Sequence, residues 1–276
     1  DQLISRRFKR ESGVQLVYIS GASLSVALAV SLFPEAGMLI STASLAVGTV
    51  AFLLQRSSEP PVRALDRNHP QRSAIWSRPV QIITLALIFV GSTFATAEVS
   101  AVAITRELGE PGAASIVIGV YAIGSFLVGI TLGALSIRIP LQRQLLIAVS
   151  VLALTALPLP FAGTSTALLA TAVFVSGVAI SPPTFITAFG LIERRVPEAM
   201  LTEGITWVMT GIGIGMALGA FVSGWVVDNF GAGNGFWVSV VASLSAMAVV
   251  ALGQASLSAA TETAECDALC AAEAAE

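Results

Sequence analysis

Long apolar runs separated by short polar segments account for most of this chain. Eight of these runs are long enough to cross a hydrocarbon layer of about 30 Å as a helix rising about 1.5 Å per residue. The expected spans are residues 14–33, 38–54, 79–104, 113–135, 145–161, 167–191, 205–227 and 236–252. The pattern predicts an all-α, polytopic membrane protein with about eight transmembrane helices.

The longest polar segment is strongly basic, and its charge sets the orientation. Residues 55–79 hold five arginines between two apolar runs. Because Lys and Arg are enriched in cytoplasmic loops, we place this segment inside. The N-terminal stretch, loops 136–144 and 193–204 and the tail then also lie inside. These regions together hold thirteen of the fourteen Lys and Arg residues, and only Arg106 falls outside.

Composition agrees with a membrane protein. The chain is 55% hydrophobic and 11% charged, with a mean hydropathy of +0.85, whereas soluble domains carry about 25% charged residues. The net charge of −3 argues against nucleic acid as a partner. The chain starts at Asp1 and no signal peptide follows, so we expect the true start to lie upstream.

Small residues recur at a spacing of four in two expected spans. They are Gly211, Gly215 and Gly219 in the seventh span and Gly129 and Gly133 in the fourth. Such stripes let helix backbones approach closely in a membrane, and packing alone is the simplest explanation for them. The run 129–135 also echoes 215–221 in a span of opposite direction, as in the inverted repeats of secondary transporters.

Three stretches resemble a known family. They are FVGSTF with AEV at 89–94 and 97–99, YAIGSFLVG at 121–129, and ERRVP with LTEGITW at 193–197 and 201–207. Residues 80–252 are similar to the C-terminal six-helix half of major facilitator superfamily transporters, especially actinobacterial exporters. The resemblance implies that residues 14–54 are helices 5 and 6, that helices 1 to 4 are absent, and that the basic segment links two halves.

The chain departs from the family pattern in two places. Drug-exporting antiporters carry a Gly-Pro pair in helix 5, but the matching place reads SGAS at residues 20–23, which argues against drug/proton antiport in particular. Gly133, Arg138 and Arg143 follow the order of the family's cytoplasmic gating motif, without its aspartate. The two arginines serve equally well as charges that orient the chain.

Glu98 is the expected coupling residue. Ionisable groups inside a spanning helix are costly and usually functional. Glu98 shares a helix face with Gly91, Ala95 and Val102, and it lies about 27 Å along the helix from Val80, in its outer third. We expect it to couple transport to protons or to bind a cationic group. The alternative is a carboxylate that simply reaches the outer interface.

Other polar side chains are candidates for a solute path. By resemblance, helices 7, 8, 10 and 11 line that path, and their candidates are Tyr121, Ser125, Thr184, Thr187, Thr206, Trp207 and Thr210. Each can equally be an interhelical hydrogen-bond partner. Pro182 and Pro183 interrupt the sixth span, which a membrane tolerates only inside protein or beside a cavity. A structural kink is the alternative there.

Catalytic chemistry is not indicated. His69 is the only histidine and lies in the basic segment, so an intramembrane serine hydrolase would lack its base. Cys266 and Cys270 lie one helical turn apart, but two thiolates alone rarely hold zinc. No phosphate-binding loop occurs. We therefore expect no enzyme activity, no cofactor and no metal.

These observations and the resemblance indicate a secondary transporter that moves a small organic solute by alternating access, with export and proton coupling expected. It would lie in the bacterial cytoplasmic membrane, with both chain ends in the cytoplasm, and act as a monomer when full length. The expected parts are two helices of the first half (1–54), a basic linker (55–79), a six-helix domain (80–254) and a flexible or weakly helical tail (255–276). The alternative is a non-transporting membrane subunit or a truncated transporter remnant.

The predicted topology can be tested by cysteine labelling of intact cells. A cysteine replacing Asn68 should resist a membrane-impermeant maleimide, because the basic segment lies inside. A cysteine in the turn 106–112 should react. Rapid labelling at position 68 from outside would overturn the whole assignment.

Overall fold

A computed structural model describes residues 39, 42–43, 45–50, 73–134, 139–180, 182–197 and 200–273. The chain divides into two compact units, Asp1–Pro70 and Gln71–Glu276. The described residues of the first unit are helical and fall within the second expected span, 38–54. The first expected span and the basic segment up to residue 72 lie outside the described residues.

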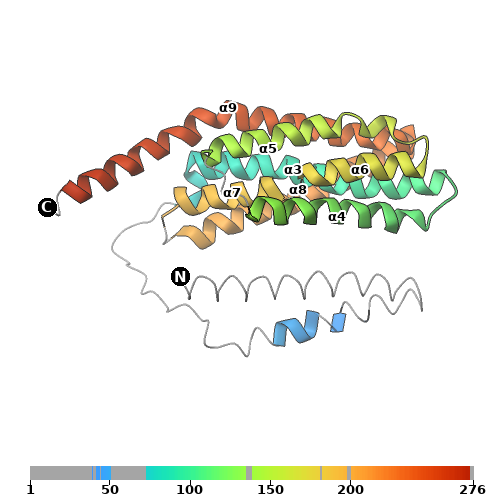
Figure 1. Ribbon diagram of the computed structural model, residues 1–276, viewed down its shortest axis with the longest axis horizontal. Helices are drawn as coiled ribbons and strands as arrows, with labels where there is room; N and C mark the ends of the chain where they lie inside the picture. Colours follow the sequence, from blue (N-terminus) through green and yellow to red (C-terminus); the bar gives the residue numbers. More distant parts are fainter. Residues whose placement is uncertain are drawn as a thin grey trace. The chain divides into compact units, whose positions relative to one another are not determined.

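The second unit is built from helices throughout its described residues. A 3₁₀ helix, η2 (Ala74–Trp76), leads into α3 (Arg78–Glu107), and α4 (Ala113–Ala134), α5 (Leu141–Ala156) and η3 (Leu159–Phe161) follow. The chain continues through α6 (Thr166–Ile180), α7 (Pro182–Arg195), α8 (Leu201–Phe230) and α9 (Ala232–Glu273). The helices pack side by side, and α9 extends beyond the others toward the C-terminus (Figure 1). The prediction of an all-α protein is confirmed.

Four stretches of this unit are long and apolar enough to cross a membrane. They are Arg78–Glu107, Leu141–Phe161, Leu201–Phe230 and Ala232–Ser258. Two shorter apolar helices, Ala113–Gly129 and Thr166–Gly177, lie between them in the sequence. Together these six coincide with the third to eighth expected spans, so this part of the chain is that of a multi-pass membrane protein.

The helices extend beyond the apolar runs that predict them. α8 extends beyond the run 205–227 at both ends. Hydropathy marks only the apolar part of a helix, whereas its backbone hydrogen bonds also continue through polar residues. α9 reaches Glu273, well into the stretch expected to be a flexible or weakly helical tail. Alanine and glutamate dominate that stretch, and both have high helix propensity.

The sixth apolar run forms two helices instead of one. α6 ends at Ile180 and α7 begins at Pro182. Proline suits the first position of a helix, because its missing N–H has no partner there in any case. It cannot continue a preceding helix without loss of a hydrogen bond. The break therefore follows from the proline pair at residues 182–183.

All four tryptophans lie near helix ends. Trp76 and Trp207 lie close to the starts of the parallel helices α3 and α8, whereas Trp225 and Trp237 lie around the connection between α8 and α9. Trp207 and Trp225 are eighteen residues apart on α8, or about 27 Å along the helix, close to the thickness of the hydrocarbon layer. Because tryptophan favours membrane interfaces, we expect the two groups of tryptophans to lie near the two surfaces of the bilayer.

α3 and α8 approach each other with their backbones almost in contact. A Cβ atom added at Gly215 would lie 1.9 Å from the carbonyl oxygen of Ile88, and one added at Gly219 would lie 2.4 Å from that of Ser92. From the first contact to the second, the residue number rises by four on α8 and also by four on α3, so the two helices run parallel. Helices in the third and seventh spans must run parallel if the chain alternates across the membrane.

Hydroxyl groups strengthen this contact. Ser92 Oγ donates to the Gly215 carbonyl at 2.8 Å, and Thr96 Oγ1 donates to the Gly219 carbonyl at 3.5 Å. Gly91 contributes from the α3 side, where an added Cβ would lie 2.5 Å from the Ile212 carbonyl oxygen. The α3–α8 interface therefore combines close packing with interhelical hydrogen bonds, the two interactions available inside a bilayer.

Replacing Gly215 or Gly219 by leucine should force α3 and α8 apart, because backbone atoms of α3 occupy the space that the side chain needs. We expect a loss of about 3 kcal/mol in the free energy of unfolding, visible as low membrane abundance and a lower thermal midpoint in detergent. Gly213→Leu is the matched control, since no atom lies within 4 Å of a Cβ added there. Equal stability of the Gly213 and Gly215 variants would contradict this account.

Candidate functional site

Glu98 and Tyr121 lie on two helices, α3 and α4, that contact each other one turn away from Glu98. Glu98 precedes the end of α3 by nine residues, and Tyr121 follows the start of α4 by eight, so each lies about 12–14 Å from that end of its helix. Phe94, one turn before Glu98, meets the Tyr121 ring edge-on with centroids 5.6 Å apart.

Burial makes this pair chemically unusual. Glu98 is half-buried, and Tyr121 is only 7% exposed. The Tyr121 hydroxyl has no hydrogen-bond partner among the described residues. An unpaired buried hydroxyl costs about 1–3 kcal/mol, so this group is a donor and acceptor that a bound molecule or a small movement of Glu98 would satisfy. A carboxylate beside aromatic rings can bind a proton or an organic cation.

Two glycines that sequence reasoning missed hold Tyr121 in place. A Cβ atom added at Gly177 of α6 would lie 2.6 Å from the Tyr121 carbonyl oxygen. One added at Gly124 of α4 would lie 2.9 Å from the Phe174 carbonyl oxygen. The backbones of α4 and α6 therefore meet at the level of Tyr121. Neither glycine belongs to a stripe in the sequence, so no periodic signal marked them.

The remaining path candidates are spread over three helices, α4, α7 and α8. Thr184 is fully buried, and its hydroxyl has no partner among the described residues. Thr187 Oγ1 donates to the Pro183 carbonyl at 2.6 Å. Thr206 and Thr210 lie on the exposed face of α8, away from Gly211, Gly215 and Gly219. Trp207 lies one turn before Gly211 in the line of those glycines and is 37% exposed. Ser125 is half-buried on α4, one turn after Tyr121.

The residues expected to act in gating are only partly described. Gly129 is half-buried on α4, Gly133 lies in the last turn of that helix, and Arg143 is exposed in the first turn of α5. Arg138 lies outside the described residues. A gating role for them stays a prediction.

Two polar contacts near the starts of α3 and α8 were not anticipated as sites. Arg195 Nη2 donates to the Leu257 carbonyl at 2.5 Å, which ties the end of α7 to α9. Burial, and then the charge of Arg194, lower the pKa of the Arg195 guanidinium. Because the ordinary pKa of arginine is far above 7, Arg195 still carries its charge at neutral pH. Glu203 accepts hydrogen bonds from Ser73 and Trp207. The stretch LTEGITW, which contains Glu203, is recognisable in the sequence, but nothing in the sequence indicated its partner Ser73, 130 positions away.

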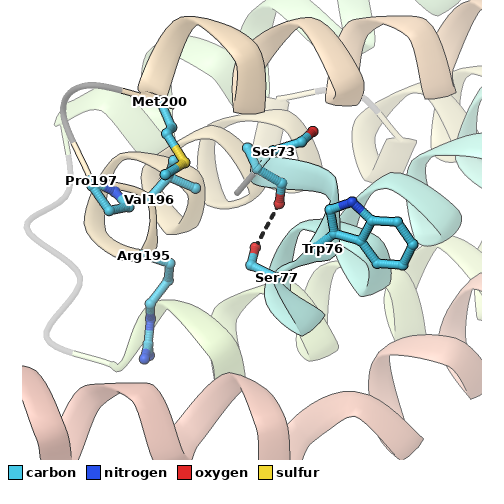
Figure 2. Close-up of a pocket in the computed structure, with 8 residues that line it drawn as sticks. Ser73, Trp76, Ser77, Arg195, Val196, Pro197 and Met200 are labelled. Atoms are coloured by element: carbon cyan, nitrogen blue, oxygen red, sulfur yellow. Dashed lines mark hydrogen bonds between the residues drawn. The ribbon is translucent and has the colours of Figure 1, made fainter. Parts of the chain in front are cut away.

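A cavity of about 260 Å³ lies beside Glu203 at this end of the unit. Figure 2 shows Ser73 and Ser77 on one side of it and Val196, Pro197 and Met200 on the other. Its lining includes none of the residues predicted from the sequence. Within the described part of the chain, no group of three His, Cys, Asp or Glu residues lies together where a metal ion could bind.

The fold and the site define a class of protein: a multi-pass helical bundle with a carboxylate inside a spanning helix is typical of membrane transporters. The family model of the Major Facilitator Superfamily matches residues 10–197 and residues 82–264. The chain therefore belongs to the Major Facilitator Superfamily, as its resemblance indicated. It is a membrane transporter of the major facilitator type, a family whose members carry small-molecule solutes and are generally not enzymes. No curated protein and no solved structure matches the chain.

The Tyr121 hydroxyl gives a prediction about stability. Tyr121→Phe removes a buried hydroxyl without a partner and should leave the thermal midpoint of the purified protein unchanged or raised. Tyr121→Ala removes the ring that packs on Phe94 and should cost roughly 3–5 kcal/mol. A clear loss of stability in the phenylalanine variant would mean that the hydroxyl has a structural partner.

Proposed function

We propose that this chain exports a small organic solute across the bacterial cytoplasmic membrane in exchange for protons, by alternating access. The observation that carries the proposal is Glu98, a half-buried carboxylate in the spanning helix α3. It lies one turn after Phe94, whose ring packs on Tyr121 of α4, a residue with a buried, unpartnered hydroxyl. A carboxyl group that gains and loses a proton is the minimum that a proton-driven carrier needs. Charged residues inside spanning helices commonly mark ion and substrate pathways.

The surroundings of Glu98 favour a binding role. The packed backbones of α4 and α6 hold Tyr121 from one side, and the edge-on contact with Phe94 fixes its ring. The carboxylate thus sits beside rigid aromatic groups, an environment that suits an organic cation as well as a proton. We propose that proton and solute compete for Glu98, which makes export depend on the proton gradient.

The exposed face of α8 is the proposed continuation of the solute path. Thr202, Thr206 and Thr210 follow one another at a spacing of four on that face. The Thr206 hydroxyl donates to the Thr202 carbonyl at 2.8 Å, and hydroxyls of this kind keep acceptor capacity for a passing solute. The opposite face of α8 is occupied by the contact with α3.

The orientation of the transporter belongs to the same proposal. We place both chain ends and the basic segment in the cytoplasm and the turn after α3 outside, as the distribution of Lys and Arg favours. The parallel course of α3 and α8 agrees with a chain that alternates across the membrane, and the choice of the cytoplasmic side rests on the Lys and Arg distribution. We also propose that the full-length protein acts as a monomer.

Glu98→Gln tests the coupling role, because it keeps size and hydrogen bonding but removes titration. In the full-length protein at normal expression, efflux of the organic cation ethidium would be followed over a range of imposed pH gradients. We expect the glutamine variant to lose its dependence on the gradient. Glu110→Gln is a matched control, since Glu110 is an exposed carboxylate in the turn between α3 and α4.

The same assay can refute the proposal. If Glu98→Gln follows the parent protein at every gradient, Glu98 is structural and reaches only the outer interface. If both variants lose gradient dependence equally, the effect belongs to external carboxylates in general and not to Glu98.

A further inference from the structure

The side chain of Glu203 binds the first residues of the second unit, where the basic segment ends. η2 follows directly on residues 55–72 and lies just after the boundary between the two units at Pro70. Its first residues contact the start of α8, 130 positions away in the sequence, through Glu203. The proposed coupling residue, Glu98, has no part in this contact, but Trp207, a candidate for the solute path, donates to Glu203.

The carboxylate of Glu203 accepts from two donors. Ser73 Oγ, directly before η2, donates to Oε1. Trp207 Nε1, one turn further along α8, donates to Oε1 at 3.3 Å. The indole thus holds the carboxylate in position, and the Ser73 hydroxyl connects it to η2. Hydrogen bonds to an ionised group are stronger than those between neutral groups.

η2 is held both by packing and by its bond to Glu203. A cavity of about 260 Å³ lies between Ser73, Ala74 and Ser77 and the connection between α7 and α8 (Figure 2). Ala74 is only 3% exposed and belongs to the buried core, against which Ile75 also packs, whereas Trp76 is 74% exposed. The bond from Ser73 to Glu203 is the polar restraint at the start of η2.

We propose that Glu203 is a clamp that fixes the end of the basic linker to the start of α8. Without the carboxylate, the Ser73 hydroxyl loses its acceptor and the start of η2 opens into solvent. With the carboxylate, a pull on the linker is passed to α8, whose glycine face lies against α3. The clamp is a conformational device that does not depend on which solute is carried or on proton coupling.

Cysteine protection at Ala74 measures the clamp directly. In the full-length protein, with Cys266 and Cys270 replaced by serine, a cysteine at position 74 should react slowly with fluorescein maleimide in inside-out membrane vesicles, because Ala74 is buried. Adding Glu203→Ala should speed this reaction at least about tenfold, since local opening then needs no charge-assisted hydrogen bonds to break. A cysteine at exposed Trp76 should react rapidly in both backgrounds.

Two controls distinguish a clamp from general unfolding. Glu193→Ala removes an exposed carboxylate on α7 and should leave the rate at position 74 unchanged. A cysteine at Ala153, which is 3% exposed on α5, should stay protected in the Glu203→Ala protein. An unchanged rate at position 74 after Glu203→Ala overturns the clamp. Exposure of Ala153 in that variant also overturns it, because Glu203 would then support the whole bundle.

Discussion

The close contact between α3 and α8 is the constraint on which the second unit depends. In a bilayer, apolar side chains gain nothing by leaving lipid for protein, so helices associate through close packing and hydrogen bonds. Here Gly215 and Gly219 bring α8 onto the carbonyls of Ile88 and Ser92, and Ser92 returns a hydrogen bond to Gly215. Because the contact is parallel, it also sets the direction of both helices across the membrane.

The candidate site follows from this packing. α3 is held against α8 and packs on α9, while α4 is held against α6 by Gly124 and Gly177. Glu98 of α3 and Tyr121 of α4 thus lie on two separately packed helix pairs, which meet through the rings of Phe94 and Tyr121. A carboxylate that must exchange a proton gains from such rigid surroundings, because the geometry of its partners does not have to be rebuilt in each cycle.

The polar contacts at the helix ends serve a different purpose from those in the middle. Glu107 Oε1 accepts from the Ala232 N–H at 2.9 Å and so caps the start of α9. Glu110 Oε2 accepts from Thr166 Oγ1 at 2.7 Å at the start of α6. Glu203 does the same for η2 at the opposite end. Carboxylates therefore join helix ends, where water and lipid headgroups lower the cost of a charge. Glycines join the helices in their middle parts, where the hydrocarbon of the bilayer makes a charge too costly.

The sequence by itself determined the all-α class, the third to eighth spans and the break at Pro182, because span length, apolar runs and proline act locally along the chain. It also pointed to Glu98, because a carboxylate within an apolar run is recognisable whichever helices pack around it. Tertiary structure decided the rest: that Phe94, one turn before Glu98, packs on Tyr121, that Gly124 and Gly177 matter, and that Glu203 reaches Ser73. These depend on contacts between helices far apart in sequence, and no periodicity within one helix specifies which neighbour it meets.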